Sequence, residues 1–172
     1  MGGESGEAGW EIGESVEADV PELLPLMRGY CDFYGTDPPE TGIEEMARAL
    51  IGGEGVVFAA RRVGSDGTAE PIAGFATSAV KWSMLRGARV ALLDDLFVDP
   101  EARGHGLADR LIEACAEWGR ARGAIALEWQ TALDNERAKS VYDRIGAKAS
   151  RWLDYELELT DAPGRAIWKG RG

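Results

Sequence analysis

The spacing of hydrophobic and polar residues changes several times along this chain, and each change predicts a boundary between elements. Residues 10–16 form a short strand-like segment. After Asp19, which can cap a helix, apolar residues recur at helical spacing. Residues 35–39 interrupt that helix, and Thr41-x-x-Glu44 has the form of a capping box that starts a second helix, ending at Gly52-Gly53. The pattern therefore predicts one strand followed by two helices.

A hairpin and a third strand are predicted next. Segments 55–63 and 71–81 have the composition of strands, and Gly64-Ser65-Asp66-Gly67 between them favours a tight reversal. A further strand-like segment, residues 89–98, stops at Asp99-Pro100.

The last third of the chain alternates between helical and strand-like segments. Residues 106–122 carry an apolar stripe at helical spacing, residues 124–131 are strand-like, residues 135–145 are helical, and residues 148–159 are strand-like again. The order βααβββαβαβ combines an antiparallel meander with later βα units. It predicts an α/β fold in the broad sense, with a mixed (α+β) sheet flanked by helices.

Length and composition set the expected organisation. The 172 residues, 45% of them hydrophobic, suit one domain, expected over residues 10–160 between loose tails at 1–9 and 161–172. No apolar run approaches the ~20 residues of a membrane span, and the first residues lack the features of a secretory signal. The two cysteines, Cys31 and Cys115, are expected to be reduced thiols in a cytoplasmic protein.

Charge and ligand spacing exclude further classes. The net charge of −11 opposes binding to nucleic acid, which needs clustered Lys and Arg. No Cys or His cluster has metal-ligand spacing, so no metal is expected. An acidic surface can draw cationic substrates, although solubility explains it as well.

The strongest local signal is the segment Arg103-Gly104-His105-Gly106-Leu107-Ala108, where a strand turns into an amphipathic helix. Glycines let backbone N–H groups approach phosphate oxygens, the helix start adds a partial positive charge, and Arg103 can add a charge-assisted contact. On its own, Gly-x-Gly before a helix is equally a turn and cap. Neither a dinucleotide fingerprint nor a P-loop is present.

This segment resembles the pyrophosphate loop of the GNAT superfamily of acyl-CoA N-acyltransferases, Arg/Gln-x-x-Gly-x-Gly/Ala, with Arg103, Gly106 and Ala108 in the specified positions. A second signature of that superfamily, Asn-x-x-Ala followed by Tyr, is matched by Asn135, Ala138 and Tyr142. The resemblance implies an acetyl-CoA-dependent N-acetyltransferase. It also implies cofactor contacts at Leu96, Phe97 and Val98 for the pantetheine arm, at Gly104, His105, Gly106, Leu107, Ala108 and Asp109 for the pyrophosphate, and at Asn135, Ala138 and Tyr142 near the arm and sulfur.

Tyr142 is the candidate general acid. An amine that attacks the thioester expels a thiolate whose conjugate acid has a pKa near ~8.5, and a phenol with a pKa near ~10 can protonate or stabilise it. A purely structural alternative is that Tyr142 packs in the core, because it lies on an apolar stripe with Val141 and Ile145.

Asp94 is the candidate base or substrate anchor. Removing a proton from a primary amine at neutral pH costs on the order of 4 to 5 kcal/mol, so a base or a water chain is needed. Strand alternation predicts that Asp94 and Asp95 face opposite sides of the sheet. The stretch 93–98 resembles one in spermidine/spermine acetyltransferases whose first carboxylate serves the amine. Asp is shorter than Glu, which makes an intervening water plausible, and a carboxylate held by neighbouring groups is the structural alternative.

Aromatic residues are candidates for the acceptor wall. Phe33 and Tyr34 end the first predicted helix, where the resembled superfamily often builds that wall, and Trp82 and Trp129 lie on predicted strands. Such side chains suit a cationic amine, although core or rim packing is their commoner role. His105, the one histidine, is expected to act as a spacer through its backbone N–H.

The predicted activity is transfer of acetyl to the primary amine of a small molecule by direct attack in a ternary complex, and the resemblance over residues 93–98 favours a polyamine-like acceptor. A non-catalytic acyl-CoA-binding or sensing module is the alternative from another class. An acyltransferase for longer chains, and an amino acid, aminoglycoside or protein amine as acceptor, also stay open. A homodimer is common in the resembled superfamily and is the expected assembly.

Overall fold

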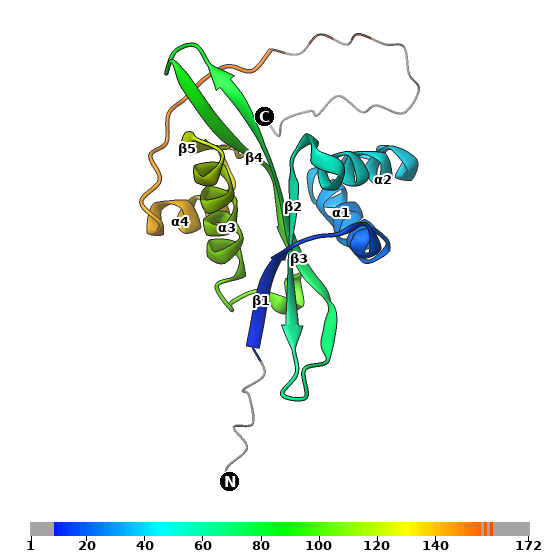
Figure 1. The fold of residues 1–172 in the computed structure, drawn as a ribbon. Coiled ribbons are helices and arrows are strands. Elements are labelled where there is room, and N and C mark those ends of the chain that lie inside the picture. Colours follow the sequence, from blue (N-terminus) through cyan, green and yellow to red (C-terminus); the bar gives the residue numbers. More distant parts are fainter. Residues whose placement is uncertain (1–8, 156, 158, 160–172) are drawn as a thin grey trace.

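The computed structural model of the chain describes residues 9–155, 157 and 159. A mixed five-stranded sheet separates two groups of helices (Figure 1), which confirms the predicted mixed α/β fold. The strands are β1 (Gly9–Glu14), β2 (Val56–Val63), β3 (Ala69–Ser83), β4 (Ala88–Val98) and β5 (Ala124–Glu128). The helices are α1 (Val20–Tyr34), α2 (Glu40–Ala49), α3 (Leu107–Ala121) and α4 (Glu136–Arg144), with short helical turns η1 (Glu17–Asp19), η2 (Leu50–Glu54) and η3 (Pro100–Ala102).

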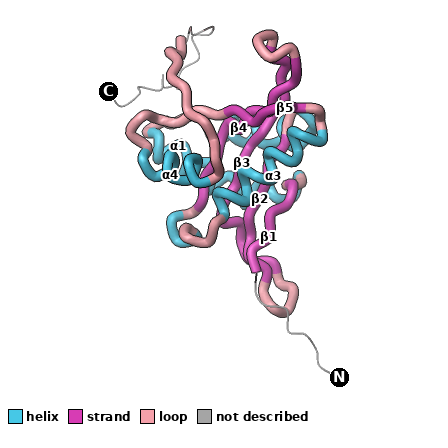
Figure 2. The backbone as a smooth tube through the Cα atoms, turned by 90° about the vertical axis from the view of Figure 1, so that its left-hand side faces the viewer, coloured by secondary structure: helices cyan, strands magenta, loops and turns pink. Residues whose placement is uncertain are grey.

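The strands lie in sequence order across the sheet. Neighbouring strands from β1 to β4 are antiparallel, and β5 joins β4 in parallel after the crossover through α3. The β2–β3 and β3–β4 hairpins project at opposite ends of the sheet (Figures 1 and 2). The predicted order of elements therefore holds from the first strand to α4.

The sheet has a hydrophobic core on each face. Helices α1 and α2 cover one face, and α3 covers the other (Figure 1). Val20, Leu23 and Phe75 centre the first core, and Leu107, Leu111 and Cys115 centre the second, all of them nearly inaccessible to solvent. Within the described part of the chain, no helix has the length and apolar character that crossing a membrane requires.

The predicted capping box at the start of α2 is wrong. The helix begins one residue before Thr41, at Glu40, and its N-cap is Pro39, which has extended backbone angles and makes no side-chain cap bond. Proline fixes the backbone before the first turn and sets the helix start without a polar cap. Glu44 instead accepts hydrogen bonds from Arg48, one turn further along the helix.

The predicted last strand, residues 148–159, is wrong for the described residues of that range, none of which lies in a strand. Residues 148–155 lie outside any strand, residues 156 and 158 lie outside the described residues, and Trp152 and Tyr155 are 81% and 90% exposed. The alternating aromatic pattern has strand propensity, but such propensity needs a partner strand and a face to pack on. The predicted tails are residues 1–9 and 161–172. Gly9 belongs to β1, whereas residues 1–8 and 161–172 lie outside the described residues and stay a prediction as tails.

Gly119 sets how closely α3 approaches the sheet. A Cβ at this position would lie 2.6 Å from the Cβ of Ala91 on β4. We expect Gly119→Ala to destabilise the fold by about 1–2 kcal/mol, since the overlap outweighs the ~1 kcal/mol by which Ala favours a helix. Gly42→Ala on α2, where the nearest atom is 3.6 Å away, is the matched control and should stabilise slightly. Urea unfolding of both variants measures this difference, and equal effects would contradict the packing argument.

Candidate active site

Strands β4 and β5, the parallel pair of the described sheet, run side by side and then separate. Their last registered pair is Leu92 with Glu128, where β5 ends, whereas β4 continues to Val98. Beyond Leu92, the edge of β4 that faces away from β3 has no neighbouring strand among the described residues. Such an edge offers backbone N–H and C=O groups to an extended ligand.

The loop between β4 and α3 turns through two glycines. Gly104 and Gly106 have φ angles of +90° and +71°, in the left-handed region where glycine costs least. Gly106 is the N-cap of α3 and provides no side chain to cap it. The N–H groups of the first helical turn are left for solvent or a ligand, and the helix dipole favours an anion there.

Two positively charged side chains, those of Arg103 and Arg137, lie near this helix start. Nε of Arg103 donates to the carbonyl of Val98 at 2.9 Å, which fixes the base of the side chain. Burial, followed by the positive charge of Arg137, lowers the pKa of Arg103. A third arginine, Arg144, forms an ion pair of 2.7 Å with Asp109.

Helix α4 presents Asn135 and Tyr142. Asn135 is the N-cap of α4: its Oδ1 accepts from the N–H of Ala138 at 3.2 Å, and its Nδ2 donates to Thr131. The Asn-x-x-Ala spacing is therefore that of a helix cap as well as a site motif. The ring of Tyr142 packs edge-to-face on Trp129, with centroids 5.2 Å apart. Burial, followed by the charge of Tyr34, raises the pKa of Tyr142, so its hydroxyl stays protonated at neutral pH.

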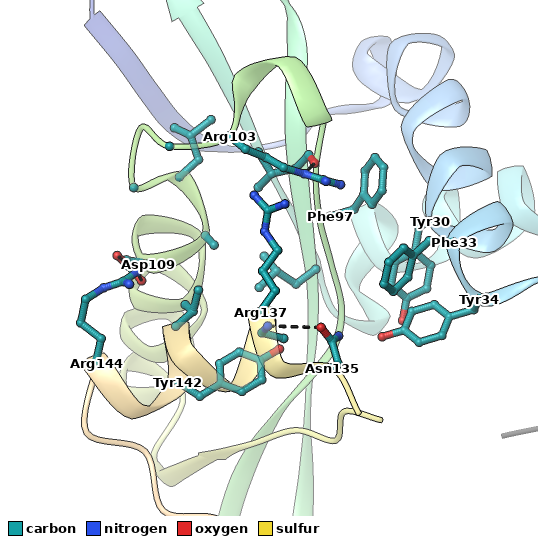
Figure 3. Close-up of a pocket in the computed structure, with 18 residues that line it drawn as sticks. Tyr30, Phe33, Tyr34, Phe97, Arg103, Asp109, Asn135, Arg137, Tyr142 and Arg144 are labelled. Carbon is teal, nitrogen blue, oxygen red and sulfur yellow. Dashed lines mark hydrogen bonds and ion pairs between the residues drawn. The ribbon is translucent and has the colours of Figure 1, made fainter. Parts of the chain in front are cut away.

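These elements enclose a cavity of about 480 Å³, a volume typical of small-molecule sites. Figure 3 shows Asn135, Arg137 and Tyr142 extending from α4 on one side, with Tyr30, Phe33 and Tyr34 from α1 on the other. The lining residues are Tyr30, Phe33, Tyr34, Leu96, Phe97, Val98, Arg103, Gly104, Gly106, Leu107, Ala108, Asp109, Asn135, Arg137, Ala138, Val141, Tyr142 and Arg144.

The wall from α1 combines aromatic rings with a carboxylate behind them. Tyr34 meets Tyr30 and Phe33 edge-to-face, with centroids 4.9 and 5.0 Å away. Burial, followed by the negative charge of Asp95, raises the pKa of Tyr30. Oδ2 of Asp95 in turn accepts a 2.7 Å hydrogen bond from the hydroxyl of buried Thr77. Negative charge behind phenol rings suits a cationic ligand.

The prediction that Asp94 and Asp95 face opposite sides of the sheet by regular strand alternation is wrong, because β4 has a bulge at these residues. Thr77 pairs with Asp95 and Ser78 with Leu93, so Asp94 is the extra residue without a partner on β3. Asp94 is exposed, makes no side-chain hydrogen bond among the described residues, and does not line the cavity. Burial of part of the side chain, followed by the charge of Asp95, raises the pKa of Asp94, and Lys81 opposes this.

Three other candidates from the sequence lie outside the cavity lining. Trp82 is 72% exposed at the β3–β4 hairpin, under the guanidinium of Arg89. Trp129 lies behind Tyr142, and His105 packs near Trp10 with centroids 5.7 Å apart. No group of three or more His, Cys, Asp or Glu that could hold a metal occurs in the described ranges.

Tyr30 and Arg137 both line the cavity but were not among the selected candidates. Sequence reasoning placed Tyr30 in the aromatic segment that ends the first predicted helix and selected only Phe33 and Tyr34 from it, and it did not consider Arg137. Tyr30 lies one helical turn before Tyr34, so it shares the face of α1 that carries Tyr34. Arg137 lies two residues after Asn135, inside the first turn of α4. A helical projection of α1 would have found Tyr30, whereas the direction of the long Arg137 side chain has no sequence signal.

Comparison with known proteins identifies the family. The model of the acetyltransferase (GNAT) family matches residues 24–147, which is most of the chain. The chain belongs to the acetyltransferase (GNAT) family. This GNAT chain is 30% identical over 136 residues to the uncharacterized N-acetyltransferase YhfO of Bacillus subtilis (strain 168), which covers 78% of this chain and 87% of that protein. The chain is therefore an N-acetyltransferase of the GNAT family.

Two further similarities extend over nearly the whole GNAT chain. The thialysine N-epsilon-acetyltransferase of Bos taurus is 26% identical over 166 residues, covering 94% of this chain and 92% of that enzyme. The structure of the aminoglycoside N-acetyltransferase AAC(6')-Iy in complex with CoA aligns with a TM-score of 0.73 at 19% identity, covering 89% of this chain and 97% of that one. At that identity the second likeness shows the fold alone.

Proposed function

We propose that this N-acetyltransferase moves an acetyl group from acetyl-CoA to the primary amine of a small molecule by direct attack in a ternary complex. One observation carries the proposal: a single cavity joins the open edge of β4, the uncapped start of α3 and the hydroxyl of Tyr142. An extended arm, an anionic pyrophosphate and a departing thiolate need those three features in that combination.

The cofactor roles follow from the elements that supply each side chain. We assign the pantetheine arm to the β4 edge at Leu96–Val98 and the pyrophosphate to Gly104–Asp109, with the side chain of Arg103 beside it. Asn135 and Ala138 would contact the arm from α4. His105 is assigned a contact through its backbone, because its side chain is not part of the cavity wall. The CoA complex of the structurally similar aminoglycoside enzyme supports this choice of cofactor.

Direct attack fits the state of the two thiols. Burial raises the pKa of Cys115 to about 12, and burial also raises the pKa of Cys31. Both thiols are therefore neutral near pH 7, whereas a thiolate is the form that attacks an acyl group. Neither cysteine lines the cavity. An acyl-enzyme intermediate on cysteine is thus disfavoured, and intersecting rather than parallel initial-rate plots are expected.

Asp94 is proposed to take the proton of the amine through water. Asp95 accepts a hydrogen bond from Thr77. The carboxylate of Asp94 has no hydrogen-bond partner among the described residues. The raised pKa of Asp94 also makes this carboxylate the better proton acceptor. We expect Asp94→Asn to lower kcat/KM by roughly 10-fold or more at neutral pH.

The pH profile separates a base from a structural carboxylate. A base works as the carboxylate, so kcat/KM of the wild-type chain should fall as the pH drops through the raised pKa of Asp94, and Asp94→Asn should lose that fall. Glu117→Gln, an exposed charge change on α3, is the control and should leave the profile unchanged. An Asp94→Asn variant that keeps the wild-type profile would exclude Asp94 as the base.

The acceptor is proposed to be a small cationic amine that meets the wall of Tyr30, Phe33 and Tyr34. The aromatic rings, the carboxylate of Asp95 behind them and the net charge of −11 all favour a cation. The thialysine N-epsilon-acetyltransferase of Bos taurus, which is similar over most of this chain, is by its name an enzyme that acetylates an amine, and this also supports an amine acceptor. Trp82 and Trp129 are left out of this wall because neither lines the cavity.

An amine panel tests the proposed function. Thiol release from acetyl-CoA is followed with spermidine, putrescine, thialysine and an aminoglycoside, and the products are identified by mass. We expect release that depends on the amine, with acetylated product. Acetyl-CoA binding without acetylation of any amine would favour the alternative, a non-catalytic acyl-CoA sensor.

The assembly of the chain into a homodimer stays a prediction. Light scattering of the purified protein tests it by measuring the mass in solution.

A further inference from the structure

Two guanidinium groups point into the same cavity from different elements. Arg103 comes from the loop before α3, and Arg137 comes from the first turn of α4. Figure 3 shows the side chain of Arg137 extending away from α4 towards Arg103. The family pattern specifies Asn135 and Ala138 but leaves the position of Arg137 open.

Neither guanidinium is neutralised within the described part of the chain. No ion pair joins Arg103 or Arg137 to a described carboxylate. The other charged residues of the cavity wall, Asp109 and Arg144, neutralise each other at 2.7 Å. Arginine stays protonated near pH 7, so two like charges face one cavity in a protein whose net charge is −11. Such an arrangement is unfavourable until an anion lies between the two charges.

The position of the pair selects the kind of anion. Both side chains stand at the uncapped start of α3, which also favours negative charge. A group with two charges and several oxygens on adjacent centres can satisfy two guanidiniums and a helix start together, whereas a single carboxylate of an acceptor cannot. The aromatic wall of α1, where we place the acceptor, belongs to a different element.

We propose that Arg137 binds the pyrophosphate of acetyl-CoA, opposite Arg103, so that the two guanidiniums hold it from both sides. The proposal rests on the proposed function and adds a cofactor-binding residue to it. The contact is charge-assisted and planar, so removing it should weaken binding about 10- to 100-fold.

Calorimetric titration of purified variants with acetyl-CoA and with 3′-dephospho-acetyl-CoA tests this proposal. We expect Arg137→Ala to weaken both ligands by the same factor, Arg137→Lys to keep part of the affinity as a point charge, and Arg103→Ala to behave like Arg137→Ala. Arg120→Ala, which removes the same charge from the exposed end of α3, should change neither affinity. A thermal scan of each variant controls for folding.

Each other outcome has a definite meaning. If Arg137→Ala binds acetyl-CoA as tightly as the wild type does, or raises only the KM of the amine, the proposal is overturned. A loss confined to acetyl-CoA and absent with the dephospho ligand places Arg137 at the 3′-phosphate and also overturns it. A wild-type chain that binds neither ligand would instead overturn the proposed function.

Discussion

Replacing Tyr142 with phenylalanine is expected to lower kcat by about 100-fold or more while leaving the Kd of acetyl-CoA within about 3-fold, because general acids contribute roughly 10²–10⁴-fold. The ring that packs on Trp129 is kept, so only the hydroxyl that serves the departing thiolate is lost. Steady-state kinetics with the best amine of the panel, together with calorimetry, measures both quantities.

The pH dependence gives this prediction a second readout. The acid form of Tyr142 is the working form, and its raised pKa keeps that form present throughout the neutral range. Wild-type activity should therefore not decline between about pH 7 and 9 through loss of this proton. Tyr155→Phe, at a position 90% exposed, is the matched control and should match the wild-type kinetics. Unchanged kcat in Tyr142→Phe would remove the hydroxyl from the mechanism.

Truncating Phe75 should have the largest effect on stability. Its side chain is 1% exposed on β3, in the core beneath α1, and its ring lies 6.3 and 6.4 Å from those of Tyr30 and Phe97. Phe75→Ala leaves a cavity that the surrounding strands cannot fill, which should cost about 3–5 kcal/mol. For a chain of this length the melting temperature should fall by roughly 6 to 20 °C.

An exposed aromatic residue is the control for that measurement. Trp82 lies on the same strand but is 72% exposed, so Trp82→Ala should change stability by only about 0.5 kcal/mol. Thermal unfolding of both variants distinguishes burial from aromatic character. Similar losses in the two variants would contradict the assignment of Phe75 to the core.

The sequence predicted the structure best at positions where a local pattern fits only one backbone conformation. Glycines at 104 and 106 before an amphipathic segment predicted a turn into a helix, and both adopt the left-handed conformation that only glycine takes easily. The apolar periods of α1 and α3 placed Leu23 and Leu111 in the two cores. The two family motifs meet in one cavity, with Arg103, Asn135 and Tyr142 in its wall.

Features that depend on contacts distant in sequence were not predictable. The bulge at Asp94 arises from its register with Thr77 and Ser78, which a single strand does not reveal. The aromatic alternation around Trp152 resembled a strand, but no described strand pairs with it. The approach of Arg137 to Arg103 depends on how α4 lies against α3, which no local pattern encodes.

Hydrogen exchange with and without saturating acetyl-CoA tests most directly the claim that this cavity is the cofactor site. We predict protection of the amides at 104–109, at the β4 edge of 96–98 and in the first turn of α4, with little change in the β2–β3 hairpin. Saturable binding with protection confined to other segments, or no protection anywhere, would contradict the account.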